Sequence, residues 1–346
     1  MSSSKVIPLE DALAVGFRKR LLAWYEAHAR DLPWRKDRDP YRVWISEIML
    51  QQTRVAAVIE HYHAFLKGFP TVRKLAAARE ASVLSVWSGL GYYRRARMLH
   101  AAAKIIVRER KGKFPGTAEE WRSLPGIGRY TAAAIASIAF GDPAAVVDGN
   151  VERVLQRLLG RRLGREEVWT SAESLLDRNR PGDFNQAMME LGATVCTPRA
   201  PSCLMCPVAE LCATRGELAS GYQAKKQHKR EIDYALHCRD GEVFLVQRPR
   251  DARLMAGMWE LPEIGVPAGA EKQVPRSVRN DKANGGTRTL LFSVRHSITV
   301  TDYTVRIWDG APLDASSGEW VAVRRLSKIP LTGLSRKVLR KAEVLS

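Results

Sequence analysis

Four of the five cysteines in the chain lie within one stretch of seventeen residues, at Cys196, Cys203, Cys206 and Cys212. Four thiolates at short, uneven spacing can surround one compact centre, either a [4Fe–4S] cluster or a zinc ion. Three prolines interrupt the stretch and indicate a loop. Disulfides are the alternative. Spacing alone does not separate iron–sulfur from zinc, because both centres accept four thiolates.

A single carboxylate, Glu47, lies in the nearly all-apolar helical segment 43–53. Burial there would disfavour the ionised form and raise the pKa of Glu47, which suits a proton donor at neutral pH. The alternative is an ordinary ion pair with Arg42 or Arg54.

A second carboxylate, Asp148, precedes a helical pattern at 151–159 that ends at Gly160. The start of a helix favours negative charge, so we expect Asp148 to keep a low pKa. The alternative is that Asp148 is only an N-cap. One carboxyl group held protonated and another held ionised would suit cleavage of a glycosidic bond through an oxocarbenium-like transition state.

Two glycine-containing motifs could contact nucleic acid. Gly126-Ile127-Gly128 predicts a tight hairpin whose free backbone N–H groups open a helix and can hold a phosphate; an ordinary helix–turn–helix corner is the alternative. Residues 89–97 combine tyrosines with arginines, which suits base stacking and phosphate binding. A solvated basic helix start is the alternative for this second motif.

The charge of the chain indicates a polyanionic partner. Its 346 residues include 55 Lys and Arg against 37 Asp and Glu, a formal net charge of +18. Nucleic acid is the polyanion that such an excess favours. There is no long apolar run to span a membrane and no secretory pattern at the start, so we expect a cytoplasmic protein that does not bind membranes.

The periodicity predicts a helical domain followed by a smaller mixed α/β domain. Helical patterns cover 43–58, 81–87 and 98–107, and a basic linker is expected at 217–231. Beyond the linker the period becomes two, with a hairpin turn at Asp240-Gly241. The expected elements there are strands at 234–237, 242–246, 289–294, 298–308 and 319–323, a loop at 264–288 and a helix at 333–344.

Taken together, these motifs resemble the helix–hairpin–helix DNA glycosylases that carry an iron–sulfur cluster, and within them the adenine-specific MutY family. The resemblance runs from about Arg30 through Cys212 and includes residues 32–35, 46–53, 89–93, the hairpin and 147–151. It implies a glycosylase domain at 8–216, the linker at 217–231 and a MutT-like (Nudix-fold) lesion-recognition domain at 232–346. It also implies a [4Fe–4S] cluster on the four cysteines.

The resemblance also assigns roles to residues. Glu47 would protonate adenine, Asp148 would stabilise the positively charged sugar, and Tyr130 and Asn150 would support them. Lyase-competent relatives have a lysine at the position of Tyr130, so the chain is expected to be a monofunctional glycosylase. The implied DNA contacts are Gln52 and Tyr92, which would enter the duplex, and Leu50, Arg35, Gly126 and Gly128.

The implied partner is double-stranded DNA with adenine opposite 8-oxoguanine or guanine, bound by a monomer in the bacterial nucleoid. In the family a Phe-Ser-His loop of the second domain reads 8-oxoguanine; the best-matching positions here are Ile298 and Thr299, in 296–300. Residues 264–288 lack the Nudix box, so nucleotide pyrophosphatase activity is not expected. The alternatives are an endonuclease III-like glycosylase/lyase acting on oxidised pyrimidines and a non-catalytic iron–sulfur protein that binds DNA.

The net charge generates a first prediction. Binding of the protein to random-sequence duplex DNA should weaken steeply as salt concentration rises, because bound lysines and arginines displace counterions from the phosphates. Fluorescence anisotropy across a salt series measures this. A response that stays flat would contradict the electrostatic argument.

Overall fold

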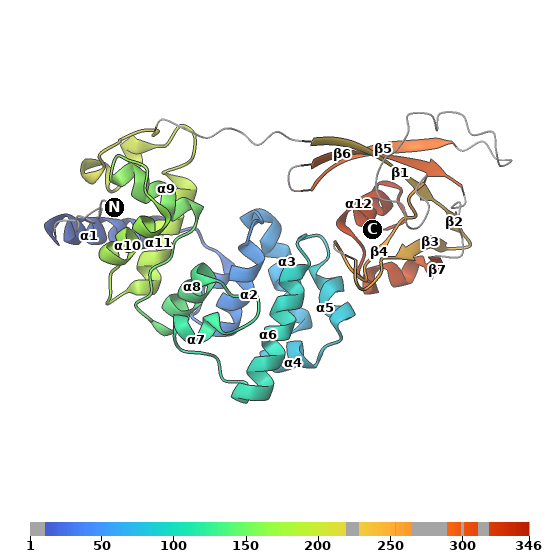
Figure 1. Cartoon of the computed structure of the whole chain (residues 1–346), viewed down its shortest axis with the longest axis horizontal. Helices are drawn as coiled ribbons and strands as arrows, with labels where there is room; N and C mark the ends of the chain where they lie inside the picture. The colour runs from blue at the N-terminus through green and yellow to red at the C-terminus, as the bar shows by residue number, and fades with distance from the viewer. Residues whose placement is uncertain are drawn as a thin grey trace, which may run out of the picture. The chain divides into compact units, whose positions relative to one another are not determined.

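The computed structural model describes residues 11–218, 228–252, 254–264, 289–298, 301–310 and 318–345. The chain forms two compact units (Figure 1). The first contains Met1–Ala77 and Arg97–Tyr222, and the second contains Ala78–Ala96 and Gln223–Ser346. The second unit therefore includes a short segment, 78–96, that the sequence organisation assigns to the helical domain. Among the described residues, no helix has the length and apolar character needed to cross a bilayer.

The first unit is helical. Its elements are α1 (Asp11–His28), η1 (Pro33–Arg35), α2 (Pro40–Leu50), α3 (Val55–Gly68), α4 (Val72–Ala77), most of α6 (Arg94–Arg110), α7 (Ala118–Arg122), α8 (Arg129–Phe140), α9 (Gly149–Leu158), α10 (Arg165–Leu175), α11 (Pro181–Thr194), η2 (Cys203–Met205) and η3 (Ala209–Leu211). The helical patterns at 98–107 and 151–159 are confirmed. Gly160 follows α9 with a φ of +69°, the left-handed conformation that favours glycine after a helix.

The helical pattern at 43–58 is divided between two helices. The chain leaves α2 at Gln51 and re-enters a helix at Val55. Gln52, between them, has a φ of +56°, which an α-helix cannot contain. The apolar periodicity continues through the break because both helices bury a face in the same unit, so the pattern gives no sign of it.

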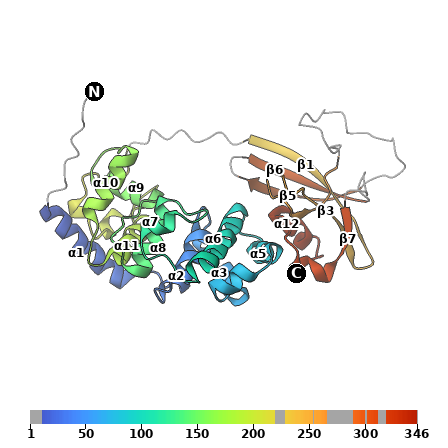
Figure 2. The same ribbon diagram turned by 60° about the horizontal axis from the view of Figure 1, so that its bottom comes forward.

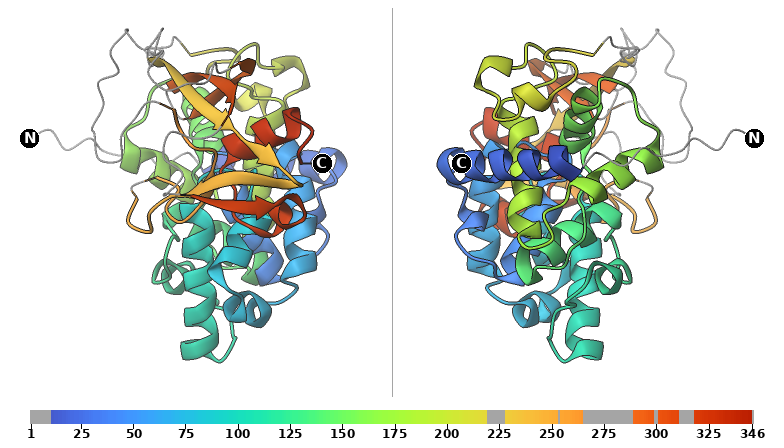
Figure 3. Two further views of the ribbon diagram at one scale, coloured as in Figure 1. Left: turned by 90° about the vertical axis from the view of Figure 1, so that its right-hand side faces the viewer. Right: turned by 90° about the vertical axis from the view of Figure 1, so that its left-hand side faces the viewer.

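Helix α8 is the central element of the first unit. It packs against α2, α7 and α11, and α11 also packs against α1 and α9 (Figure 2; Figure 3, right). Ten consecutive positions of α8 carry small or apolar side chains, and most of them are buried. The approach of α8 to α11 is close: a Cβ atom added at Gly182 would lie 2.6 Å from the Ser137 carbonyl oxygen and 2.8 Å from Ile138 Cα.

The second unit combines two small sheets with helices (Figure 3, left). Its elements are α5 (Glu80–Trp87), β1 (His228–Leu236), β2 (Cys238–Arg239), β3 (Glu242–Gln247), β4 (Trp259–Glu260), β5 (Leu290–Ile298), β6 (Thr301–Asp309), β7 (Gly318–Ala322), η5 (Val323–Lys328) and α12 (Gly333–Lys341). One sheet has the order β1-β6-β5, with β1 parallel to β6; in the other, β3 pairs with β2, β4 and β7. Val243, Val305 and Val338 are fully buried in the shared core.

The expected elements of the second unit are largely confirmed. Asp240 and Gly241 have φ values of +49° and +75°, the conformation of a two-residue hairpin turn. Most boundaries differ from the expectation by only a few residues, and two differ by more. Strand β1 begins at His228, inside the expected linker, and β5 continues to Ile298. Residues 265–288, which make up nearly all of the expected loop, lie outside the described residues.

The close approach of α8 and α11 generates a prediction. Gly182→Ala should lower the free energy of unfolding by about 1–3 kcal/mol, because the new methyl group would overlap backbone atoms that cannot move independently. Urea unfolding measures the change. Gly116→Ala is the matched control, because a Cβ atom there would meet nothing within 4 Å. Equal stabilities of the two variants would contradict the packing argument.

Candidate active site

Glu47 is buried on α2 and is 5% exposed. The Tyr130 hydroxyl donates a hydrogen bond to its Oε2 atom at 2.9 Å. Burial raises the pKa of Glu47 to about 7; the hydrogen bond from Tyr130 and the charge of Arg35 lower it, and the charge of Asp148 raises it. Among the described residues no arginine forms an ion pair with Glu47, and Arg42 instead pairs with Asp37 at 2.6 Å. Glu47 is therefore a buried acid that exchanges its proton near neutral pH.

Tyr130 lies in the first turn of α8, directly after the glycine hairpin. Its hydroxyl is within 3.3 Å of the Met189 sulfur as well as 2.9 Å from Glu47. Burial, followed by the charges of Glu47 and Asp148, raises the pKa of Tyr130 well above its ordinary value. The phenol therefore stays protonated and acts as a fixed hydrogen-bond donor.

Asp148 is the N-cap of α9, as the alternative interpretation expected. Its Oδ1 atom accepts from the backbone N–H groups of Asn150 at 2.9 Å and Val151 at 2.8 Å, and its Oδ2 atom accepts from the Asn150 side chain at 3.1 Å. The expectation of a low pKa is wrong: burial raises the pKa of Asp148, and the hydrogen bonds from the helix start only oppose that rise. All three hydrogen bonds are of the kind that stabilises an ionised carboxylate.

Arg153, one turn further along α9, connects this carboxylate to the cysteine segment. Its guanidinium donates to the Asn150 side-chain oxygen at 2.8 Å and to the backbone oxygens of Gly192 at 2.6 Å and Cys196 at 2.8 Å. Gly192 lies so close to α9 that an added Cβ atom would be 2.6 Å from the Asn150 Cβ and 3.0 Å from the Asn150 carbonyl oxygen. The N-terminal turn of α9 is thus fixed against α11.

The four cysteines are free, partly buried and gathered around the end of α9. Arg157 on α9 donates to the Cys196 sulfur at 3.3 Å, and its backbone oxygen accepts from Cys212 at 3.3 Å. Burial raises the pKa of Cys206 to about 11, and the neighbouring three thiols act in the same direction. The four sulfurs therefore share one electrostatic environment.

The chemistry of this donor set suits a thiolate-bound centre. Four free thiols within one short segment are ligands that both a [4Fe–4S] cluster and a zinc ion accept. Among the described residues, no group of three or more His, Cys, Asp and Glu side chains is already placed to hold a metal ion. The thiols therefore fit either centre by type.

The sequence interpretation missed a buried ion cluster beside Arg35. Glu190 on α11 is fully buried, and it accepts from Arg30 at 2.6 and 2.8 Å and from Arg35 at 2.8 Å. Burial alone would raise the pKa of Glu190, but these hydrogen bonds outweigh it and lower the pKa to about 2. The local signal was slight, a lone glutamate among apolar helix positions, as at Glu47.

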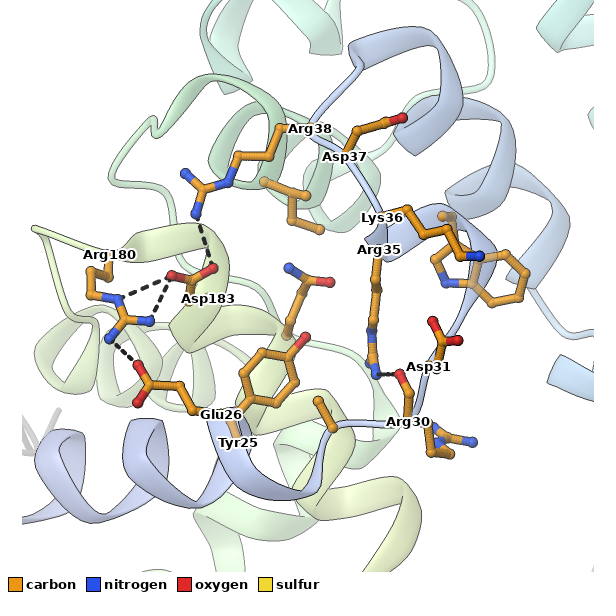
Figure 4. Close-up of a pocket in the computed structure, with 14 residues that line it drawn as sticks. Tyr25, Glu26, Arg30, Asp31, Arg35, Lys36, Asp37, Arg38, Arg180 and Asp183 are labelled. Atoms are coloured by element: carbon orange, nitrogen blue, oxygen red, sulfur yellow. Dashed lines mark hydrogen bonds and ion pairs between the residues drawn. The ribbon is translucent and has the colours of Figure 1, made fainter.

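A cavity of about 380 Å³ opens next to this cluster (Figure 4). Arg35 projects into it and donates to the Arg30 carbonyl oxygen at 3.2 Å, while Arg180 bridges Glu26 and Asp183 on the opposite side (Figure 4). The other lining residues include Tyr25, Trp34, Lys36, Arg38 and Gln186. Arg35 therefore lines a cavity and also influences the pKa of Glu47.

The glycine hairpin between α7 and α8 is confirmed. Gly126 has a φ of +77°, and a Cβ atom there would lie 2.5 Å from Met98 Cβ, so both its conformation and its surroundings require glycine. Gly128 is the N-cap of α8 and makes no side-chain cap hydrogen bond. Gly128 therefore offers no capping side chain to the backbone N–H groups that open α8.

The two residues that the resemblance places inside the duplex share a rare backbone conformation. Gln52 and Tyr92 have φ values of +56° and +47°. Both are exposed, Tyr92 to 45%. Gln52 belongs to the first unit, where it follows the partly buried Leu50, and Tyr92 belongs to the second. Left-handed backbone at residues other than glycine is strained and often found at functional positions.

The structure describes little of the two positions, Ile298 and Thr299, that the resemblance assigns to lesion recognition. Thr299 lies outside the described residues, and only the backbone of Ile298 is described. Ile298 is the last residue of β5 and pairs with Thr301, while His296 pairs with Tyr303. The positions 296–298 therefore belong to a strand rather than to a loop.

Comparisons with known proteins match two parts of the chain to two families. Residues 45–176 match the model of the HhH-GPD superfamily of base excision DNA repair proteins, and residues 234–341 match a NUDIX domain. A thermostable thymine-DNA glycosylase of known structure is 30% identical, with a TM-score of 0.56 over 59% of this chain and 97% of that chain. Endonuclease III in a trapped covalent complex with DNA has a TM-score of 0.51 at 24% identity, covering 58% of this chain and 96% of that one. At this identity, the similarity to endonuclease III supports the fold and nothing further.

Similar curated proteins include several adenine DNA glycosylases. The human protein (Homo sapiens) is 41% identical over 320 residues, which cover 73% of this chain and 58% of the relative. The Rattus norvegicus protein is 43% identical over 80% of this chain and 57% of the relative, and the Arabidopsis thaliana protein is 40% identical over 76% and 50%. The chain thus spans between one half and three fifths of the length of these relatives.

The burial of Glu47 generates a stability prediction. Below pH 4.5 the carboxyl is protonated in both folded and unfolded chains; between 4.5 and 7 only the unfolded chain ionises, so stability falls as pH rises. Above pH 7 the loss reaches up to about 3 kcal/mol. Glu47→Gln has no charge to bury, so its Tm should exceed that of the wild type by several degrees at pH 8.5 and differ little at pH 5.

Calorimetry at the two pH values checks this. Glu60→Gln, an exposed glutamate on α3, is the matched control and should leave Tm nearly unchanged at both. A Tm gain for Glu47→Gln that is equal at pH 5 and pH 8.5 would show that Glu47 does not bind a proton in this range.

Proposed function

This chain belongs to the HhH-GPD superfamily of base excision DNA repair proteins, and we propose that it hydrolyses the N-glycosidic bond of adenine mispaired with 8-oxoguanine or guanine in duplex DNA. The observation that carries the proposal is the juxtaposition of a buried acid with a pKa near 7 and a carboxylate held by three hydrogen bonds. The similarity to adenine DNA glycosylases over most of the chain supports adenine as the base removed.

The proposed reaction begins with extrusion of the adenine from the stack, as enzymes that act on a base require. Glu47 then donates its proton to the adenine ring at N7, which makes the base a better leaving group. The Tyr130 hydroxyl, fixed by its high pKa as a donor, orients the Glu47 carboxyl through the 2.9 Å hydrogen bond. Protonated Glu47 is available up to about pH 7, so base release should slow above that pH.

Asp148 serves the other half of the reaction. As the C–N bond breaks, positive charge develops on the sugar, and the Asp148 carboxylate stabilises it electrostatically. Asn150 supports Asp148 by donating to it from both backbone and side chain. A water molecule completes hydrolysis. Tyr130 has no amine to form a Schiff base with the sugar, so the proposed enzyme is monofunctional.

The proposed DNA contacts lie at the glycine hairpin and at the exposed turns that carry Gln52 and Tyr92. The hairpin glycines Gly126 and Gly128 present the start of α8 to a phosphate, and Gln52 and Tyr92 enter the duplex. Leu50 and Arg35 are proposed as further contacts to the DNA, close to the extruded base. The net charge of +18 supports binding to the DNA backbone in general. The protein is proposed to act as a monomer.

The four cysteines are proposed to hold a [4Fe–4S] cluster. Their free, partly buried thiols, the Arg157 hydrogen bond to Cys196 and the similarity to adenine DNA glycosylases support this centre. The cluster would fix the loop at 196–212 against the end of α9.

The proposed domain organisation is a glycosylase domain at 8–216, a linker at 217–231 and a MutT-like domain at 232–346. The NUDIX match over 234–341 supports the last of these. Its proposed role is recognition of 8-oxoguanine through Ile298 and Thr299.

Asp148→Asn tests the proposed reaction. The variant keeps the shape and the N-cap but loses the charge, so it should bind a duplex with adenine opposite 8-oxoguanine and release adenine at least about 10²–10³-fold more slowly. Single-turnover base release measures this, with guanine, cytosine and thymine as other opposing bases. Asp177→Asn is the matched control, because Asp177 also accepts two backbone N–H groups at 2.9 Å.

Two results would contradict the proposal. Normal turnover in Asp148→Asn would show that this carboxylate takes no part in the reaction. A stable covalent adduct with DNA after borohydride treatment would instead favour a glycosylase/lyase acting on oxidised pyrimidines.

The cluster proposal has its own test. Purified protein should show broad visible absorption with iron and sulfide in near-equal amounts, and Cys203→Ser should lose much of both. Cys238→Ser is the matched control, because the fifth cysteine is exposed and lies in the second unit. A colourless protein with one zinc ion would contradict the assignment.

A further inference from the structure

The turn that carries Tyr92 is strained and needs external support. Gly89, Gly91 and Tyr92 have φ values of +109°, +71° and +47°. A Cβ atom added at Gly91 would meet nothing within 4 Å, so the backbone conformation alone requires glycine there. For a tyrosine the left-handed conformation costs about 1–2 kcal/mol, and such strain persists only where the surroundings hold it.

Part of the support is local. The Trp87 indole donates to the Gly91 oxygen at 3.1 Å, and Arg95 donates to the oxygens of Leu90 at 3.2 Å and Gly91 at 3.3 Å. The Arg95 guanidinium also lies 5.4 Å from the ring centres of both Trp87 and Tyr92. These contacts fix the tip of the turn but not its two ends.

The ends of the turn are held by the C-terminal part of the same unit. Ser88 and Tyr93, which flank the turn, both donate to the Leu331 backbone oxygen, at 2.9 and 3.1 Å. Arg336 on α12 donates from Nε to the Ser88 hydroxyl at 3.0 Å. Ser88, Tyr93 and Leu331 are all buried. Residues more than two hundred positions apart in the sequence thus form one closed network around the turn.

The 330–332 segment is itself anchored. Trp259 on β4 donates its backbone N–H to the Pro330 oxygen at 2.8 Å and accepts from Thr332 at 2.9 Å. The Thr332 side chain caps α12 by accepting from Ser335. The Leu331 oxygen is therefore a fixed acceptor, whose position is set by the sheet and by α12.

The position of Arg336 carries an energetic cost for the folded protein. Burial lowers its pKa, its Nη2 atom has no hydrogen-bond partner, and no ion pair with a carboxylate is found for it among the described residues. A buried charge without a carboxylate partner does not favour folding. Its identified side-chain hydrogen bond reaches Ser88, at the start of the turn.

We propose that Arg336, with the Leu331 oxygen, is a positioning residue for Tyr92: the C-terminal part of the second unit sets the turn that presents this side chain to DNA. The proposal rests on the proposed function only in taking Tyr92 as a side chain that enters the duplex. It makes the C-terminal part a direct determinant of how Tyr92 engages the mispair, separate from any reading of 8-oxoguanine by Ile298 and Thr299.

A double-mutant cycle tests the proposal. Binding is measured by anisotropy on a mispaired duplex whose adenosine carries a 2′-fluorine, which resists glycosidic cleavage. Arg336→Gln should weaken binding about tenfold, the equivalent of one hydrogen bond to a charged donor. Tyr92→Ala should weaken binding at least as much, and the double variant no more than Tyr92→Ala alone. Losses that multiply in the double variant would overturn the proposal.

Matched variants separate positioning from charge. Arg340→Gln removes an exposed arginine from the same helix and should not share the coupling with Tyr92→Ala. Tyr93→Phe removes only one hydroxyl and should show a smaller loss than Arg336→Gln, again absent in the Tyr92→Ala background. It also keeps the test available if Arg336→Gln does not fold.

Amide hydrogen exchange in the DNA-free protein gives an independent answer. The Leu90 and Arg95 amides are hydrogen-bonded within the turn, to Trp87 and Tyr92. They should exchange faster in Arg336→Gln and at the wild-type rate in Arg340→Gln; unchanged rates in both variants would overturn the proposal. If the wild type binds mispaired and paired duplexes equally, the proposed function fails, and the exchange rates still decide whether Arg336 positions the turn.

Discussion

The site depends on one desolvated carboxyl group. Glu47 lies in a helix whose other buried residues are mostly apolar, and its identified side-chain hydrogen bond is with a phenol rather than a cation. Burial keeps the proton on Glu47 up to about pH 7, and the hydrogen bond from Tyr130 only opposes this rise of the pKa. Asp148 adds to the effect of burial, since two nearby carboxylates resist ionising together. The charge of Arg35 acts in the opposite direction and lowers the pKa of Glu47, but it is the smallest of these influences.

Helix α9 connects the parts of that unit. Its first residues hold Asp148 as an N-cap, Arg153 reaches from its middle to the Cys196 backbone, and Arg157 reaches the Cys196 sulfur. A helix is stiff along its axis, so an ordered cysteine loop at one end stabilises the carboxylate at the other. A centre bound by the cysteines would therefore contribute to the geometry of the site without touching the reacting atoms.

The sequence predicted correctly those features that depend on neighbouring residues in the chain. The burial of Glu47 followed from its helical neighbours, and the Asp240-Gly241 turn followed from residue type. The patterns failed where distant segments decide the outcome. The pKa of Asp148 depends on its burial in the folded unit, and the Glu190 cluster depends on arginines 155 and 160 residues away. The left-handed Gln52 carries no compositional signal, because glutamine is an ordinary helix residue.

The contact of Gly192 with Asn150 has a consequence for how this molecule can change. Gly192 on α11 has no Cβ atom, and this lets the first turn of α9 approach α11 closely. An alanine at Gly192 would displace Asn150 and, through the hydrogen bonds between them, Asp148. A position with no functional group thus helps to set the geometry of the acids.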